Sequence, residues 1–404
     1  MTEAVTGPVT SEAADGVDRV VESIRDAQAR RTGLRIIGAG RWLDAGRPVR
    51  AEGALSIAPL TGIVEYVPGD LTLTARAGTT LGEIARATGA HGQWLTLDPF
   101  GDDLGTLGAT VATASSGPLA TGFGTPRDIV LGAEFVTGTG AVVRAGGRVV
   151  KNVAGFDLVR LVTGAWGSLG ALTEVTVRLR ARPEVDTTVV VAVGASAENL
   201  ADCTARLRAL PFTPYAAEIL NATLAGRLGI EPRTCLLARL GGSDDAVRAQ
   251  RAALGAFGEI RDVTGPVWPA LQGVEPAGSA TLRLARLPSR FAETWLAATR
   301  LTESFPDALL QGAPFRGVVR CVVPDVSTAR DGGRGHVLGG VQERLARALT
   351  APFEGTRIFE RMPASIWRTF APSAVTDRLS QGIKAAYDPL CLLNPGVLGD
   401  CPGR

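Results

Sequence analysis

The segment that most constrains the fold of this chain runs from Gly164 to Leu179, with the sequence GAWGSLGALTEVTVRL. Glycines recur at every third position, at Gly164, Gly167 and Gly170, and alternation of apolar and polar residues follows them. Such alternation is typical of a strand with one buried face. Because glycine permits tight turns and close approach of the backbone, the segment predicts a sharp turn that leads into a sheet.

Two further glycine-rich turns, at 38–46 and 101–117, also adjoin predicted strands. Main-chain N–H groups in such turns can hold a pyrophosphate. Strand packing is the better explanation for any one of these turns, but three of them in the first half of the chain favour a shared phosphate-bearing ligand. Small hydroxyl residues in the second turn support this interpretation: Thr106, Thr113, Ser115 and Ser116.

The first turn does not form a dinucleotide fingerprint of the Rossmann type. Gly38 and Gly40 supply its first two glycines, but Leu43 occupies the third small position, and no acidic residue ends a second strand where the motif requires one. If these turns bind a phosphate-bearing ligand, they therefore do so in a fold other than the Rossmann fold.

Composition excludes several classes of function. The chain has 404 residues, 45% of them hydrophobic, which is enough for two domains. A net charge of +2 without a basic stripe argues against nucleic-acid binding. The five cysteines contain no C-x-x-C pair, so they indicate neither a zinc ribbon nor an iron–sulfur cluster, and they fit a reducing compartment. The N-terminal residues lack the features of a signal peptide, and no apolar run has the length of a membrane span, so we expect a cytoplasmic protein.

The pattern of apolar residues predicts an α+β fold with a domain boundary near Pro183. The segment 385–400 is unusually apolar, and we expect it to dock onto a domain. A hairpin is expected over 129–147, with its turn at 138–140. Helices are predicted at 13–30, 79–90, 197–209 and 244–256, and strands at 33–40, 71–78, 92–99, 187–195, 234–240 and 316–324.

Five segments, in the same order, resemble the FAD-binding domain of the vanillyl-alcohol oxidase / PCMH flavoprotein superfamily. They are LRIIGAGRWL, LDPFGDDLGTLGATVATASSG, GFGTPRDIVLGAEFVTGTG, TGAWGSLGALTEVTVRL and YDPLCLLNPGVL. The longer stretch GGRVVKNVAGFDLVRLVTGAWGSLG most resembles the FAD-binding E subunit of bacterial glycolate oxidase. The resemblance implies a PCMH-type two-subdomain FAD-binding domain at 1–182, an α+β cap domain at 183–370, and a C-terminal segment at 371–404 that returns to the first domain.

The resemblance also implies which residues bind the cofactor. Arg41 and Trp42 stand where covalent family members carry histidine, so we expect FAD to be bound noncovalently. Ala114 replaces the family's asparagine in the second turn, so that contact must come from the backbone or from Ser115. The residues expected to bind FAD are Gly38, Ala39, Gly40, Arg41, Trp42, Pro99, Thr106, Leu107, Gly108, Thr113, Ser115, Gly124, Gly164, Gly167, Gly170, Leu172 and Asn394.

The implied function is that of the FAD-binding subunit of a glycolate oxidase (dehydrogenase) complex. Such a complex oxidises glycolate, a small 2-hydroxy acid, to glyoxylate, with a second FAD-containing catalytic subunit and an iron–sulfur subunit as partners. It would be cytoplasmic, or peripheral at the inner membrane through its partners. Two alternatives stay open: a self-sufficient FAD-dependent 2-hydroxy-acid or alcohol oxidoreductase, and a non-catalytic scaffold subunit.

No catalytic residue follows from the sequence, and no metal site is expected. The histidine-rich metal and substrate motif of the resembling catalytic subunits is missing, because the only histidines are His91 and His336, far apart in the chain. Arg283, Arg286 or Arg320 could bind the carboxylate of a 2-hydroxy acid, but no candidate base lies close to them in sequence. We therefore expect the chain alone not to oxidise glycolate at a useful rate.

Overall fold

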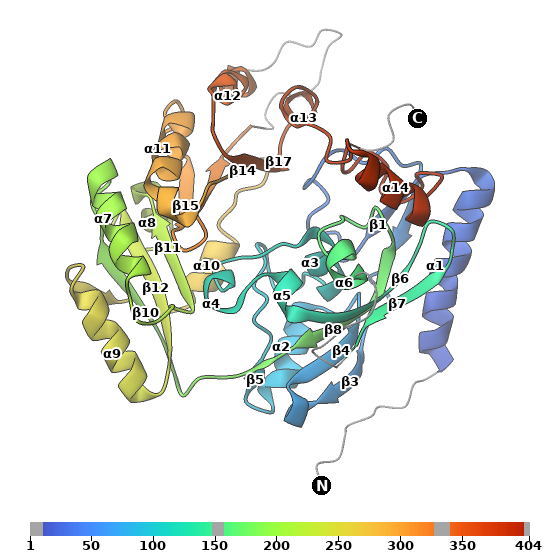
Figure 1. Ribbon diagram of the computed structural model, residues 1–404, viewed down its shortest axis with the longest axis horizontal. Helices are drawn as coiled ribbons and strands as arrows, with labels where there is room; N and C mark the ends of the chain where they lie inside the picture. The colour runs from blue at the N-terminus through green and yellow to red at the C-terminus, as the bar shows by residue number, and fades with distance from the viewer. Residues whose placement is uncertain (1–10, 148–156, 327–339, 400–404) are drawn as a thin grey trace. The chain divides into compact units, whose positions relative to one another are not determined.

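The computed structural model describes residues 11–147, 157–326 and 340–399, and the chain divides into two compact units (Figure 1). The first unit comprises Met1–Gly117, Phe123–Arg182 and Pro372–Arg404, and the second comprises Pro118–Gly122 and Pro183–Ala371. The chain therefore returns to its first unit after completing the second.

A five-stranded antiparallel sheet forms the centre of the first unit. Its strand order is β3-β4-β8-β6-β7, so the two edges are β3 and β7. The predicted hairpin over 129–147 is present as β6 and β7. The strands are β3 (Ile63–Val67), β4 (Thr72–Arg76), β6 (Val130–Val136), β7 (Val142–Gly146) and β8 (Ala171–Arg178).

Two smaller sheets complete the strands of the first unit. β1 (Leu34–Ile37) pairs in parallel with β2 (Gly53–Ser56), and β5 (Gln93–Trp94) pairs with β9 (Arg180–Ala181). The strand predicted over 92–99 is thus much shorter than expected. The residues after Trp94 leave the sheet and lead into the second glycine-rich turn.

Several helices of the first unit begin with a side-chain N-cap. The hydroxyl of Thr80 accepts the amide of Glu83 while the Glu83 carboxylate accepts the amide of Thr80, which forms a capping box at the start of α2. Thr80 is therefore the N-cap of the helix that was predicted over 79–90. The helices are α1 (Ser11–Arg30), η1 (Pro68–Asp70), α2 (Leu81–Gly89), α3 (Leu107–Thr113), α5 (Pro126–Ile129), α6 (Leu158–Val162) and α14 (Arg378–Tyr387).

An eight-stranded sheet of the order β13-β10-β12-β11-β15-β16-β14-β17 forms the centre of the second unit. All its strand pairs are antiparallel. The strands are β10 (Val185–Ala192), β11 (Ala216–Leu220), β12 (Cys235–Gly242), β13 (Ile260–Asp262), β14 (Ala280–Ala285), β15 (Leu309–Ala313), β16 (Val318–Val323) and β17 (Thr356–Arg361).

Helices cover both faces of this larger sheet. One buried cluster joins the sheet to α7, α9, α11, α12 and α13, and a second joins its other face to α8 and α10. Figure 1 shows α7, α9 and α11 along one side of the strands. The helices are α7 (Ala197–Arg208), α8 (Ala222–Arg227), α9 (Asp244–Gly255), α10 (Val267–Gln272), η2 (Pro288–Arg290), α11 (Phe291–Thr302), α12 (Gly340–Thr350) and α13 (Ala364–Phe370), and α4 (Ala120–Phe123) lies where the chain briefly enters this unit.

The predicted mixture of helix and sheet is confirmed, with a separate hydrophobic core in each unit. Among the described residues, no helix is both long and apolar enough to cross a membrane.

Candidate functional site

The first glycine-rich turn follows directly after β1 and leaves its main-chain donors open. The amides of Gly38, Ala39 and Gly40 donate no hydrogen bond to any residue that the structure describes. Gly40 has a φ of +71°, and the nearest atom to a Cβ added there would be 3.8 Å away. Consecutive amides without acceptors, in a turn without bulky side chains, suit the oxygens of a phosphate.

The second turn meets the first one at Thr106. The hydroxyl of Thr106 caps α3 by accepting the amide of Ala109 at 3.3 Å. A Cβ on Gly38 would lie only 2.6 Å from this hydroxyl oxygen, so glycine is required for the two turns to approach this closely. The predicted residues Gly38 and Thr106 therefore lie together.

Leu107 and Gly108 pack the second turn against the end of β4, and their contact with a cofactor stays a prediction. Their amides donate to the carbonyls of Thr79 and Ala77, at 2.9 and 2.8 Å. A Cβ on Gly108 would lie 2.6 Å from the Cβ of Ala77. These contacts pack α3 against the end of β4, so the two amides are not open to a ligand.

The third turn is joined by hydrogen bonds to the end of α3. The amide of Gly164 donates to Val111 O at 3.0 Å, and the amide of Trp166 donates to Ala112 O at 2.8 Å. Gly164 and Gly167 have φ values of +81° and +67°, which is why these positions favour glycine. The second and third turns thus form one continuous region.

Gly170 differs from the other two glycines of its series. It does not have a positive φ, so the left-handed conformation of Gly164 and Gly167 does not continue at this residue. A Cβ on Gly170 would lie 2.5 Å from the ring of Phe135, which is fully buried. Leu172 also lies in the core, at 5% exposure. Packing of the five-stranded sheet explains both residues, and their contact with a cofactor stays a prediction.

The C-terminal segment completes the region by pairing with β1. The amide of Leu34 donates to Leu392 O at 2.7 Å, and the amide of Asn394 donates to Leu34 O at 2.9 Å. The Asn394 side chain accepts the amide of Ile36 at 2.8 Å and donates to Trp166 O at 2.7 Å. Asn394 therefore connects the strand before the first turn with the third turn.

A buried ion pair holds this segment in place. Asp388, which is fully buried, accepts the ammonium group of Lys384 at 2.9 Å and the amides of Leu392 and Leu393, also at 2.9 Å. The same ammonium group donates to Ser168 O at 2.8 Å. Sequence reasoning identified the motif around Asp388 but did not assign this role to the two charges.

Among the predicted residues, Ser115 has a side chain that is suited to form a hydrogen bond with a ligand. Its hydroxyl is buried and has no hydrogen-bond partner among the described residues. A buried polar group without a partner costs free energy, and such groups in native proteins mark binding sites or bound water. Thr113 differs, because its hydroxyl donates to Ala109 O at 2.8 Å within α3.

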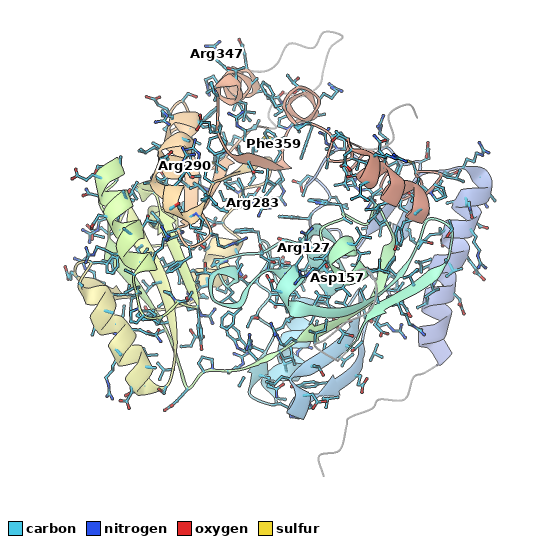
Figure 2. All side chains as sticks on the ribbon, viewed as in Figure 1. Arg127, Asp157, Arg283, Arg290, Arg347 and Phe359 are labelled. Atoms are coloured by element: carbon cyan, nitrogen blue, oxygen red, sulfur yellow. The ribbon has the colours of Figure 1, made fainter. Side chains whose placement is uncertain are left out.

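Two cations lie at the edges of the three turns. Arg41 of the first turn pairs with Asp102 of the second, and both side chains are largely exposed. Arg127 donates to Thr163 O at 3.3 Å, next to Gly164 (Figure 2). Arg127 was part of a quoted motif, but we did not single it out as a site residue.

The remaining predicted residues border this region. Gly124 has a φ of +90° and packs against Asp128, so the turn before α5 explains it. Trp42 is half-buried in the first turn, and Pro99 is half-buried just before the second turn. Lys151, Asn152 and His336 lie outside the described residues.

In the second unit, the arginines proposed as carboxylate ligands are already paired. Arg320 donates to Glu360 at 2.8 Å and pairs with Glu275, while Arg283 lies 2.7 Å from Glu360. Burial opposes a charge on Glu275, but Arg320 and Arg361 hold the pKa of its carboxyl below the usual value. Figure 2 labels Arg283, which belongs to this network.

Arg286 is engaged as well. It pairs with Glu293 at 2.9 Å and stacks on the ring of Phe353 at 4.6 Å. A carboxylate ligand would therefore have to displace an acidic partner from any of the three arginines.

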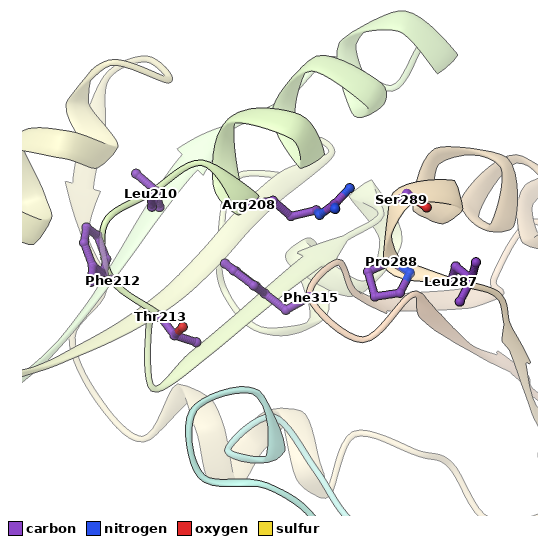
Figure 3. Close-up of a pocket in the computed structure, with 8 residues that line it drawn as sticks. All are labelled: Arg208, Leu210, Phe212, Thr213, Leu287, Pro288, Ser289 and Phe315. Carbon is purple, nitrogen blue, oxygen red and sulfur yellow. The ribbon is translucent and has the colours of Figure 1, made fainter.

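A surface pocket of about 480 Å³ opens on the second unit (Figure 3). Arg208 is the one ionisable group among its described lining residues, so the pocket lacks a base for proton abstraction. The other residues that line it are Leu210, Phe212, Thr213, Leu287, Pro288, Ser289 and Phe315.

The three turns of the first unit therefore form the site that best suits a ligand. They combine open amides, an unpartnered buried hydroxyl and glycines that leave room for close approach. These groups donate hydrogen bonds, and none of them is a nucleophile or base. The arrangement suits a cofactor with phosphates.

Comparison with known proteins identifies such a cofactor domain. Residues 13–146 match the family described as "FAD binding domain". The chain is 34% identical to "Glycolate oxidase subunit GlcE" of Escherichia coli K12 over 257 residues, which are 63% of this chain and 67% of that protein. It is 32% identical to "Glycolate oxidase subunit GlcD" of Bacillus subtilis 168 over 46% of this chain and 38% of that one.

A third relative is similar over nearly the whole chain. "D-2-hydroxyglutarate dehydrogenase" of Xanthomonas citri pv. viticola is 26% identical over 95% of this chain and 87% of its own length. Among solved structures, p-cresol methylhydroxylase with substrate bound has a similar fold, with a TM-score of 0.71 and 18% identity over 95% of this chain and 87% of that one. The predicted PCMH-type fold is thereby confirmed.

Proposed function

Because the chain belongs to the PCMH-type FAD-binding oxidoreductases, the family of glycolate oxidase subunit GlcE, we propose that it is the FAD-binding subunit of a glycolate oxidase (dehydrogenase) complex. FAD is its cofactor, and its relatives are FAD-dependent oxidoreductases that act on hydroxy acids. The similarity to GlcE, a named subunit, is the observation that carries the proposal.

The three glycine-rich turns supply the groups that hold FAD in this proposal. The open amides of Gly38, Ala39 and Gly40 donate to the pyrophosphate, and the Ser115 hydroxyl gains its missing partner. Arg127 adds positive charge beside the third turn. Bound FAD supplies two-electron redox chemistry, and the chain supplies binding and orientation.

We propose that the FAD is held without a covalent bond. The first turn, GAGRWLDAG, contains neither histidine nor cysteine. Acid precipitation should therefore release the yellow colour into the supernatant. Flavin fluorescence that stays with the protein band on a denaturing gel would contradict this attachment mode.

The second unit supports a subunit that works with partners. A 2-hydroxy acid needs a cation for its carboxylate and a base for its hydroxyl proton. Arg283, Arg286 and Arg320 are each paired with glutamates, so none offers an uncommitted charge to a substrate. We propose a second FAD-containing subunit and an iron–sulfur subunit as partners, in a cytoplasmic complex that reaches the inner membrane only through them.

Anaerobic flavin reduction tests this function. The purified, FAD-loaded chain is mixed with glycolate or D-lactate, and flavin absorbance is followed with and without the catalytic flavin subunit. We expect bleaching only when that subunit is present. Rapid bleaching of the chain alone would refute the accessory role.

One observation favours an alternative, a self-sufficient FAD-dependent 2-hydroxy-acid oxidoreductase. The D-2-hydroxyglutarate dehydrogenase relative is matched over 87% of its length, so the chain has nearly the extent of a whole enzyme of this family. Bleaching of the lone chain by a 2-hydroxy acid in the same experiment would establish this alternative.

A further inference from the structure

Trp166 has a backbone conformation that a bulky residue rarely adopts. Its φ is +55°, in the left-handed region that glycine and asparagine usually occupy. Such a conformation costs free energy and persists only where surrounding contacts enforce it. In this chain it lies between two glycines, Gly164 and Gly167, in the third turn of the FAD site.

The indole ring of Trp166 reaches the first turn. A Cβ on Gly46 would lie 2.8 Å from the ring atom Cζ3 of Trp166 and 3.1 Å from Cε3. Gly46 ends the turn that begins with the open amides of Gly38, and its own φ is +78°. Only glycine at position 46 leaves room for the ring, so Gly46 and Trp166 pack in direct contact.

The main chain of Trp166 joins two further segments. Its amide donates to Ala112 O of α3 at 2.8 Å, and its carbonyl accepts the side chain of Asn394 at 2.7 Å. Trp166 thus contacts the first turn, the helix of the second turn and the C-terminal segment. These contacts explain how its strained φ is maintained.

We propose that Trp166 is a positioning residue for FAD, whose ring fixes the end of the first turn so that the amides at 38–40 stay open to the pyrophosphate. The half-buried ring occupies the space beside Gly46 and prevents the turn from closing on itself. Trp166 acts through the turn and touches no reacting atom. The inference concerns FAD binding by the isolated chain, so it stands or fails independently of the proposed complex.

The test compares FAD affinity with stability in the absence of FAD. Trp166→Gly removes the ring and also the strain of the positive φ, because glycine adopts this conformation freely. We expect the dissociation constant for FAD to rise by about tenfold or more, while the apo protein melts at the same temperature or higher. A merely structural tryptophan would instead lower the melting temperature.

Two further variants keep the test decisive if Trp166→Gly folds poorly. Trp166→Phe retains a ring beside Gly46, so it should bind FAD within about threefold of the wild type. Gly46→Ala places a methyl group against the ring and should weaken FAD binding in the wild type. In the Trp166→Gly background the same substitution should weaken FAD binding less, because only the cost of alanine at the positive φ of Gly46 remains once the ring is gone.

Trp295→Phe is the matched control. Trp295 is 3% exposed in the core of the second unit, so this change should lower stability without altering FAD affinity. Unchanged FAD affinity in Trp166→Gly, or equal effects of Gly46→Ala in both backgrounds, would overturn the proposal.

Discussion

Removing the carboxylate of Asp388 should destabilise the first unit strongly. Asp388→Ala leaves the Lys384 ammonium group, whose side chain is 7% exposed, without its counter-charge. It also removes the acceptor of the amides of Leu392 and Leu393. Breaking a buried ion pair costs about 3–5 kcal/mol, and each buried amide left without an acceptor costs roughly 1–3 kcal/mol.

These costs share one carboxylate and do not add fully. We therefore expect a loss of about 5 kcal/mol, which is a large part of the ~5–15 kcal/mol that stabilises a typical protein. Because 1 kcal/mol shifts the melting temperature of a unit of this size by about 2–4 °C, the melting temperature should fall by about 10–20 °C. Differential scanning calorimetry and urea unfolding measure both quantities.

Asp377→Ala provides a matched control on the same helix. Asp377 is exposed and caps α14 by accepting the amides of Leu379 and Ser380, so its loss should cost only about 1 kcal/mol. The double variant Lys384→Met/Asp388→Asn, which leaves no uncompensated charge, should recover part of the loss. Equal melting temperatures for Asp388→Ala and Asp377→Ala would refute the reasoning.

Three other substitutions test separate features. Ala114→Gly should stabilise the protein by about 0.5–1 kcal/mol in urea unfolding, because Ala114 ends α3 with a φ of +49°, and a destabilised variant would contradict this. Gly170→Ala should lower the free energy of unfolding by about 1–3 kcal/mol, because the added methyl group overpacks against Phe135. The folded fraction of this variant should bind FAD with unchanged affinity. A variant of full stability that loses FAD affinity would instead indicate that Gly170 contacts the cofactor directly. Burial raises the pKa of the Glu174 carboxyl despite Arg76 nearby, so the folded state binds a proton more tightly than the unfolded state. The contribution of Glu174 to stability therefore falls as pH rises above about 4.5, and Glu174→Gln should gain stability relative to the wild type between pH 4 and 7; a difference independent of pH would exclude this.

Local patterns in the sequence predicted the regular elements well. Alternation and turn residues predicted the hairpin at 129–147 and the strand at 71–78, which became β6–β7 and β4. Helix periodicity predicted a helix over 79–90, which became α2 with Thr80 as its N-cap. These features depend on neighbours within a few residues, and the sequence displays those neighbours directly.

Contacts between distant segments could not be predicted in the same way. Nothing local indicates that Trp166 packs on Gly46, or that the Lys384 ammonium group donates to Ser168 O. Gly170 continues the spacing of Gly164 and Gly167, yet it has no positive φ and packs closely on Phe135. A glycine in a sequence does not reveal which of these two reasons applies.

The hydrogen bond between the Ile36 amide and the Asn394 side chain also limits when the first unit can complete its folding. These residues are 358 positions apart, and the strand that carries the first turn gains this neighbour only after Asn394 has been synthesised. At a translation rate of about 5–20 residues per second, β1 waits roughly 20 to 70 s for its partner segment. During that interval the whole second unit emerges from the ribosome and is free to fold. Completion of the candidate site therefore depends on a segment that is synthesised after most of the second unit.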